Sequence, residues 1–269
     1  MSSRRVNRSS SARPSRGERR SNVRVARVPE LAGKTAVVTG ASSGIGLATD
    51  RALRAAGVRT GVGARRVELL EGDVREQLDV ADAASCERFV AGIVERLGAI
   101  DFLVNAAGLA LGREPFDGST EEDERIVLET NVNGLIRMTR LCLPHLRDGG
   151  HIVNIGSIAG RQAYPDGSLY VTSKFAVRGF TYALREDLLG RPIRITTVDP
   201  GLVETNFSRV RFRGDEEAAR KVYQGVEAIA PDEIAECVLF ALTRPSHVNV
   251  DELVVKALAQ SSGARILRL

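Results

Sequence analysis

Short runs of β-branched and apolar residues alternate with longer amphipathic stretches from residue 31 to the end of the chain. The runs that predict strands are 35–39, 59–64, 76–80, 102–105, 151–156, 194–199 and 252–255. The stretches with helical periodicity are 45–56, 84–97, 122–146, 169–189 and 232–242. Apolar strands that alternate with helices predict an α/β fold, with a doubly wound parallel sheet covered by helices on both faces. Because no repeat or Pro/Gly/Ser-rich linker interrupts residues 31–269, we expect one domain there.

The N-terminal segment differs in composition from the rest of the chain. Residues 1–28 hold nine Arg, seven Ser, one Glu and no Lys. The whole chain carries a net charge of +4, but the other residues hold 29 basic and 33 acidic side chains, a net of −4. A segment with so few apolar residues cannot form a core, so we expect a disordered extension at 1–28. A transit peptide, a nucleic-acid-binding arm or a start codon assigned too early are the alternatives.

The length of the apolar runs and the spacing of the cysteines narrow the class of protein. No apolar run approaches the ~18 residues that span a bilayer. The three cysteines, Cys86, Cys142 and Cys237, lie far apart and have no metal-like spacing. We therefore expect a cytoplasmic protein with reduced thiols, without a metal site and without a membrane partner.

A glycine-rich turn follows the first predicted strand and opens the first predicted helix. Its glycines allow a pyrophosphate to approach the backbone closely, and the helix N-terminus supplies N–H donors. A tight turn without a ligand is the alternative, but the strand-to-helix position favours dinucleotide binding. The residues expected to contact the cofactor here are Gly40, Ser42, Ser43, Gly44, Ile45 and Gly46.

The end of the second predicted strand indicates which dinucleotide binds. An acidic residue there would bind the ribose 2′-hydroxyl of NAD, whereas arginine accommodates a 2′-phosphate. The chain reads Arg65-Arg66, with no carboxylate before Glu68. Two guanidinium groups suit a phosphate dianion, so the sequence predicts NADP(H), with Arg65 as the main contact and Arg66 assisting. Two solvated arginines are the alternative.

Tyr170 and Lys174 lie four positions apart in a predicted helix, so they share one face. An adjacent ammonium lowers the pKa of a phenol and makes it a proton donor and acceptor. The alternative is a surface phenol beside a solvated lysine.

These motifs together resemble the short-chain dehydrogenase/reductase family. The matching residues are Thr39-Gly-x3-Gly-x-Gly46, Asn105-Ala-Ala-Gly108, Asn131, Ser157, Tyr170-x3-Lys174 and Pro200-Gly201, spread over roughly residues 31–256. The resemblance implies a Rossmann-type sheet of about seven strands and hydride transfer between NAD(P) and a carbonyl or alcohol.

The resemblance also implies roles for individual residues. Tyr170 would exchange a proton with the substrate oxygen, and Lys174 would hold the nicotinamide ribose and lower the pKa of the phenol. Ser157 would bind the substrate oxygen, while Asn131 would distort its helix so that a carbonyl anchors a water leading to Lys174. Further cofactor contacts are expected from Asp79, Val80, Asn105, Ala106, Gly108, Tyr170, Lys174, Pro200, Gly201, Val203 and Thr205.

Within the family, two stretches look like the NADP-dependent 3-hydroxy acid dehydrogenases: residues 105–115 and residues 200–215, with Ser246-His-Val-Asn249 further on. The second stretch occupies the mobile segment that covers the substrate in this family. It carries Arg209, Arg211 and Arg213, and one of them is hypothesised to bind the substrate carboxylate. Solvated charges on that segment are the alternative.

Two features depart from the family pattern. Only residues 67–78 lie between Arg66 and Asp79, so the crossover helix expected there is truncated to a turn or two. This predicts a looser wall on the adenine side and weaker cofactor binding. Asn-Ala-Ala-Gly also replaces the more frequent Asn-Asn-Ala-Gly.

Two other functions stay open at this stage. A broad-specificity carbonyl or 3-ketoacyl-type reductase would use the same residues, because the fold does not fix the substrate. An NADP-sensing regulator would use residues 1–28 on nucleic acid, although it has no need of an activated phenol. The resemblance to the family also implies a homo-oligomer, a dimer or tetramer joined through the helices at 122–146 and 169–189.

Overall fold

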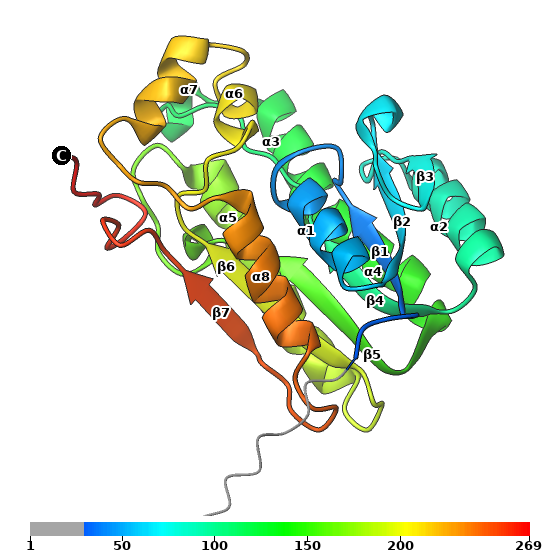
Figure 1. The fold of residues 1–269 in the computed structure, drawn as a ribbon. Coiled ribbons are helices and arrows are strands. Elements are labelled where there is room, and N and C mark those ends of the chain that lie inside the picture. Colours follow the sequence, from blue (N-terminus) through cyan, green and yellow to red (C-terminus); the bar gives the residue numbers. More distant parts are fainter. Residues whose placement is uncertain (1–29) are drawn as a thin grey trace, which may run out of the picture.

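The computed structural model describes residues 30–269, so the extension predicted at 1–28 lies outside the described part of the chain. A seven-stranded sheet of order β3-β2-β1-β4-β5-β6-β7 forms the centre, and all neighbouring strands are parallel (Figure 1). The strands are β1 Thr35–Thr39, β2 Arg59–Ala64, β3 Val74–Gln77, β4 Ile100–Asn105, β5 Leu146–Ile155, β6 Arg194–Pro200 and β7 Glu252–Val255. The predicted doubly wound parallel sheet is confirmed.

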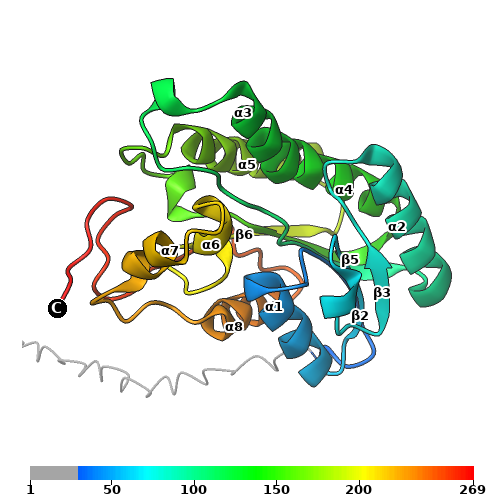
Figure 2. The same ribbon diagram turned by 90° about the horizontal axis from the view of Figure 1, so that it is seen from above.

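Helices cover both faces of the sheet (Figure 2). One face carries α1 Gly44–Ala55 and α8 Pro231–Leu242, and the other carries α2 Ala83–Leu97, α3 Glu121–Leu128, α4 Gly134–Cys142 and α5 Ser168–Asp187. Successive strand side chains point to opposite faces, so Val38 packs with Leu53 of α1 while Val37 packs with Phe89 of α2. Within residues 30–269, no helix has both the length and the apolar character needed to cross a membrane.

The long helix predicted at 122–146 is interrupted. The π-helical turn η3, Glu129–Asn133, separates α3 from α4, and the last predicted residue, Leu146, already belongs to β5. The cause is a tertiary contact: the side chain of Asn131 accepts a hydrogen bond from Leu109 N at 2.8 Å and donates one to Leu109 O at 2.7 Å. Widened turns of this kind occur frequently at functional sites.

Two further predictions of secondary structure need correction. The third strand is β3, Val74–Gln77, and not 76–80, because Val74 is the buried residue that pairs with Gly61 of β2. The segment after β6 contains α6 Phe207–Arg211 and α7 Glu216–Tyr223, which were not predicted. Asp215 caps α7 by accepting hydrogen bonds from Glu217 N and Ala218 N, both 3.0 Å.

The crossover between β2 and β3 is as short as the sequence predicted. It contains a single 3₁₀ turn, η1 Val67–Leu69. Leu70 is 3% exposed and fills the apolar cluster on the α1 face, where it occupies part of the space that a crossover helix would cover. Glu71 then ties the loop to α1 through ion pairs with Arg51 and, at 3.2 Å, Arg54.

We expect Leu70→Ala to lower the free energy of unfolding by about 2–5 kcal/mol, because it leaves a cavity under the short crossover. Leu69→Ala is the matched control: its side chain is 42% exposed, and a surface change costs at most about 0.5 kcal/mol. Denaturant unfolding of both variants measures the difference. Equal losses would show that the loop does not cover the sheet through Leu70.

Candidate active site

A cavity of about 850 Å³ lies at the carboxyl ends of the strands, the usual place for ligands in such sheets. Every residue predicted to bind cofactor or substrate or to act in catalysis lines it except Asn105 and Asn131. Asn105 was predicted to contact the cofactor, but its side chain points to β5 and α4 and does not line the cavity. There it donates hydrogen bonds to Asn154 Oδ1 at 2.9 Å and Thr139 Oγ1 at 3.0 Å.

The glycine-rich turn has the close packing that a dinucleotide requires. Gly40 has φ +69°, and a Cβ there would lie 2.7 Å from the Cα of Ala107. A Cβ on Gly46 would lie 2.4 Å from the carbonyl oxygen of Gly40, so this turn tolerates no side chain at either position. The turn brings the N-terminus of α1, with its free N–H groups, to the cavity wall. These residues therefore fit a bound pyrophosphate.

The end of β2 places two cations at the same cavity. Arg65 and Arg66 are both exposed and line it together with Asp79 and Val80, which follow β3. Among residues 30–269, no carboxylate pairs with either guanidinium group. Two uncompensated guanidinium groups at this position fit a ribose 2′-phosphate.

Asn131 lies behind the cavity and joins three segments. Besides its paired hydrogen bonds with Leu109, its amide donates to Ser173 Oγ of α5 at 3.0 Å. The side chain is 1% exposed, so these bonds are shielded from water. Asn131 thus fixes the loop after β4 and the helix α5 relative to one another. This keeps the side chains of Tyr170 and Lys174 on α5 at the cavity wall.

Tyr170 and Lys174 lie on one face of α5, as the spacing predicted. Both line the cavity, and the Lys174 Nζ lies 5.7 Å from the centre of the Tyr170 ring. Lys174 is buried, 6% exposed, and its Nζ donates to the carbonyl oxygen of Ile155 at 2.9 Å. Burial lowers the pKa of Lys174 to about 8, while the negative charge of Asp199 raises it.

The pKa of Tyr170 differs from the expectation. Burial raises the pKa of this phenol above its ordinary value. The groups that lower the pKa are the hydroxyl of Ser157 and the guanidinium of Arg211. The predicted lowering by Lys174 is therefore not met in this geometry, because the ammonium is directed at a backbone carbonyl instead. The raised pKa keeps the phenol protonated at neutral pH, as a proton donor requires.

Ser157 is fixed at the end of β5. Its Oγ accepts a hydrogen bond from Ala159 N at 3.1 Å, caps the 3₁₀ turn η5 Ile158–Gly160, and lies 3.5 Å from the carbonyl oxygen of Pro200. A hydroxyl oriented by two backbone groups, next to the phenol of Tyr170, can bind an oxygen atom of a substrate.

The three arginines of the segment after β6 have different surroundings. Arg209 pairs with Glu216 at 2.7 Å on the surface, and Arg213 pairs with Asp123 of α3 at 2.7 Å. The Arg211 guanidinium instead lies 6.0 Å from the Tyr170 ring centre. It donates to the carbonyl oxygen of Gly112 at 2.9 Å, to the Tyr164 hydroxyl at 3.1 Å and to the carbonyl oxygen of Asp166 at 3.3 Å.

Several residues of the site carried no signal in the sequence. Tyr164 contributes a hydroxyl and a ring beside Arg211, and Tyr223 of α7 donates to Val203 O at 3.2 Å. From the C-terminal segment, Gln260 Oε1 accepts from Leu202 N at 2.8 Å, and Arg268 donates to the carbonyls that end α7. These contacts join residues far apart in the chain, so no local pattern reveals them.

Comparison with known proteins identifies similar sequences. A model of the family "short chain dehydrogenase" matches residues 34–216. The NADP-dependent 3-hydroxy acid dehydrogenase of Schizosaccharomyces pombe is 40% identical over 253 residues, which cover 88% of this chain and 98% of that protein. The NADP-dependent 3-hydroxy acid dehydrogenase YdfG of Escherichia coli K12 is 40% identical over 236 residues, which cover 84% of this chain and 95% of that protein.

Solved structures show the same arrangement. The closed form of serine dehydrogenase complexed with NADP+ has a TM-score of 0.81 and 38% identity, covering 87% of this chain and 99% of that one. A short chain dehydrogenase from Burkholderia cenocepacia in complex with NADP has a TM-score of 0.74 and 28% identity, and the match covers 88% of this chain and 99% of that one. NADP, predicted from Arg65 and Arg66, is thereby confirmed as the cofactor.

Proposed function

This chain belongs to the short chain dehydrogenase family, as an NADP-dependent oxidoreductase acting on hydroxyl groups, and we propose that its substrate is a 3-hydroxy acid or the corresponding semialdehyde. The position of Arg211 beside the phenol of Tyr170 carries this proposal. The names of the relatives, 3-hydroxy acid dehydrogenases and a serine dehydrogenase, support the same class of substrate.

The cofactor is held by groups from three parts of the sheet. The glycine-rich turn and the N-terminus of α1 would bind the pyrophosphate, Arg65 and Arg66 would bind the 2′-phosphate, and Lys174 would hold the nicotinamide ribose. The remaining walls come from Asp79, Val80, Ala106, Gly108, Pro200, Gly201, Val203 and Thr205. When bound, NADPH supplies a hydride for carbonyl reduction, and NADP+ accepts one in alcohol oxidation.

Proton transfer is the task of Tyr170. In reduction, its phenol donates a proton to the carbonyl oxygen, which Ser157 holds by a hydrogen bond. The phenolate that remains is stabilised by the Ser157 hydroxyl and the Arg211 cation, the two groups that lower its pKa. Lys174 lies on the same face of α5, where its Nζ donates to the carbonyl oxygen of Ile155, so its role is to hold the nicotinamide ribose beside Tyr170. In oxidation the phenolate takes the proton from the alcohol.

The carboxylate of the substrate is bound by Arg211. Among residues 30–269, no carboxylate pairs with this guanidinium; its partners are two carbonyl oxygens and one hydroxyl, so its charge is available to a ligand. Arg209 and Arg213 are already paired with Glu216 and Asp123. A 3-hydroxy acid carries its carboxylate two bonds from the reacting carbon, so Arg211 and Tyr170 must lie close together, as they do.

We expect Arg211→Ala to raise KM for 3-hydroxy acids roughly 10–100-fold, because the substrate carboxylate loses one charge-assisted hydrogen-bonding partner. KM for neutral ketones should change little, because they have no group to pair with the cation. Steady-state assays of both substrate classes, with Arg209→Ala as the surface control, measure the selectivity.

The same assays separate the alternatives. An equal rise of KM for acids and neutral ketones in Arg211→Ala would favour a broad-specificity carbonyl or 3-ketoacyl-type reductase. No turnover of any hydroxy acid or ketone, combined with tight NADPH binding, would favour an NADP-sensing regulator. Either result would remove the 3-hydroxy acid proposal.

We also propose a homo-oligomer, a dimer or tetramer, in which α5 and the helical segment formed by α3 and α4 pair with the same segments of another copy. Exposed aromatic residues on α5 support this: Phe175 is 44% exposed and Tyr182 is 42% exposed. A cytoplasmic location fits the free thiols of Cys86, Cys142 and Cys237. The single folded unit remains proposed as residues 31–269, with residues 1–28 as a separate extension.

A further inference from the structure

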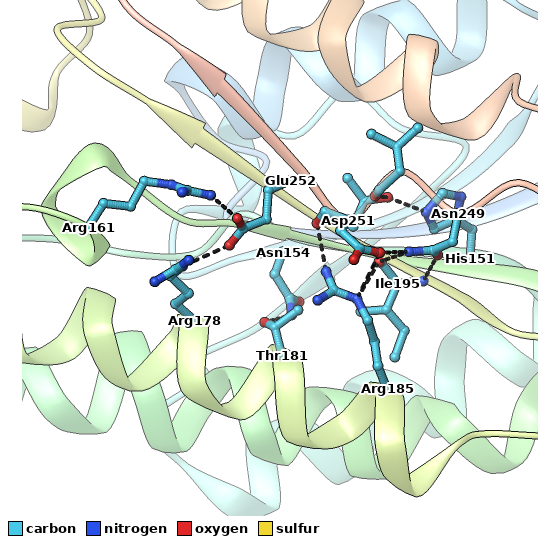
Figure 3. A network of polar contacts seen from close by, with 12 residues as sticks. His151, Asn154, Arg161, Arg178, Thr181, Arg185, Ile195, Asn249, Asp251 and Glu252 are labelled. Atoms are coloured by element: carbon cyan, nitrogen blue, oxygen red, sulfur yellow. Dashed lines mark hydrogen bonds and ion pairs between the residues drawn. The ribbon is translucent and has the colours of Figure 1, made fainter.

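A chain of alternating charges leads from the cavity wall to the surface of α5. Asp199 of β6, only 2% exposed, accepts a hydrogen bond from Arg161 Nε at 2.8 Å. Arg161 also pairs with Glu252 of β7, which accepts a second hydrogen bond from Arg178 Nε at 2.8 Å. Figure 3 shows both arginines converging on Glu252. None of these four residues lines the cavity, so contact with a ligand does not explain them.

Asp199 lies against the strand end that holds Lys174. A Cβ on Gly156 would lie 2.0 Å from Asp199 Oδ1, so the carboxylate is in close contact with the backbone at the end of β5. The preceding residue, Ile155, supplies the carbonyl oxygen that binds Lys174 Nζ at 2.9 Å. The carboxylate and the ammonium are thus both buried beside the same two residues.

The geometry points to Asp199 as a positioning residue whose buried negative charge, maintained by Arg161, keeps Lys174 protonated beside Tyr170. The inference rests on the proposed roles of Tyr170 and Lys174. It gives Glu252 the task of orienting Arg161, since Glu252 pairs with Nη2 of the guanidinium whose Nε pairs with Asp199, and Glu252 is itself balanced by Arg178.

The surrounding charges act as this role requires. Burial raises the pKa of Asp199, Arg161 and Lys174 lower it, and Glu252 raises it. Burial would also raise the pKa of Glu252, but hydrogen bonds from Arg178 and Arg161 lower it to about 2. Glu252 is therefore ionised throughout the neutral range. Because burial and the charge of Glu252 both favour the neutral form of Asp199, the cation of Arg161 is needed to keep the Asp199 carboxylate ionised.

The sign of the effect on catalysis follows from these charges. Asp199 raises the pKa of Lys174 and also that of Tyr170. Carbonyl reduction needs the phenol protonated and the amine charged, so activity falls as pH rises through these two pKa values. Removing the carboxylate charge lowers both pKa values. The alkaline limb of the pH profile must then move to lower pH.

The test is the pH profile of kcat/KM for NADPH-dependent reduction. We expect Asp199→Asn to move the alkaline limb down by about one pH unit, hence a roughly tenfold loss on that limb. Arg161→Met should give a shift in the same direction, because it leaves Asp199 without its cation, whereas Arg161→Lys should retain most of the normal profile. Asp251→Asn is the matched control: this carboxylate side chain, on the same edge of the sheet, is 60% exposed and pairs with Arg185 (Figure 3).

An unshifted limb in folded Asp199→Asn would overturn the inference. If that variant fails to fold, Arg161→Met and Arg161→Lys decide: identical limbs would overturn it, and a shift only in Arg161→Met would support it. Tyr170→Phe separates this result from the proposed function. Full turnover in Tyr170→Phe would show that Tyr170 is not the proton donor and would contradict the proposed function. An inactive Tyr170→Phe, combined with an unshifted pH profile in Asp199→Asn, would contradict only the role of Asp199.

Discussion

Tyr170→Phe will lower kcat for NADPH-dependent reduction by about 10²–10⁴-fold, the usual contribution of a positioned proton donor. The ring and its packing remain, including the edge contact with Phe207 at 5.4 Å between ring centres, so the fold should be unaffected. The lost hydroxyl acts mainly on the substrate oxygen, and the glycine-rich turn, Arg65, Arg66 and Lys174 remain for the cofactor, so binding of NADPH should be almost unchanged. Single-turnover kinetics with saturating NADPH will isolate this step from product release.

Tyr182→Phe provides the matched control for that experiment. Tyr182 lies further along the same helix, is 42% exposed, and is stacked between Arg178 and Arg185 away from the cavity. It should keep the full kcat. Turnover by Tyr170→Phe at a rate close to that of the unchanged protein would mean that another group supplies the proton, and the proposed mechanism would be wrong.

The parts of the fold set by short-range patterns could be predicted from the sequence. The strands β1, β2 and β7 have the predicted limits, because each lies between clear turns and β1 and β7 consist mainly of β-branched or apolar residues. The cofactor site was predictable for a similar reason. The glycine-rich turn and the Arg65-Arg66 pair each follow a strand, and carboxyl ends of parallel strands meet at one edge of the sheet.

Features that depend on distant contacts could not be predicted in the same way. The resemblance predicted a distortion of the helix at Asn131, and the π-helical turn confirms it, but the hydrogen bonds that fix the break reach a residue 22 positions earlier and carry no local signal. Arg211 and Arg213 have similar local sequences, yet the carboxylate that pairs with Arg213 lies 90 positions away. The raised pKa of Tyr170 depends on burial, which the spacing of Tyr170 and Lys174 does not reveal.

One missed element did carry a local signal. Asp215 precedes Glu216 and Glu217, an N-cap followed by acidic residues in the first turn, which is a typical start of a helix. The helix that follows, α7, packs against α6, and residues of both line the cavity. The segment after β6 is therefore an ordered cover over the cavity, and its helices present Arg211 to the site.

Simultaneous replacement of Arg65 and Arg66 by alanine will raise KM for NADPH by about 10²–10³-fold, because two charge-assisted contacts to the 2′-phosphate are lost. NADH lacks this phosphate, so its KM should change little and the preference between the two cofactors should narrow or reverse. The short crossover between β2 and β3 increases the effect that we expect. With only the turn η1 beside the adenine side, we expect the two arginines to supply a larger share of the binding free energy than a full helix would leave to them.

Fluorescence titration with NADPH and NADH, together with steady-state kinetics, will measure the change in preference. Arg75→Ala is the control, because Arg75 is also exposed and lies on the neighbouring strand β3, outside the cavity wall. If NADPH bound to the double variant as tightly as to the unchanged protein, the 2′-phosphate would have to lie elsewhere. The strand-end arginines would then be surface charges, although the cofactor itself would still be NADP.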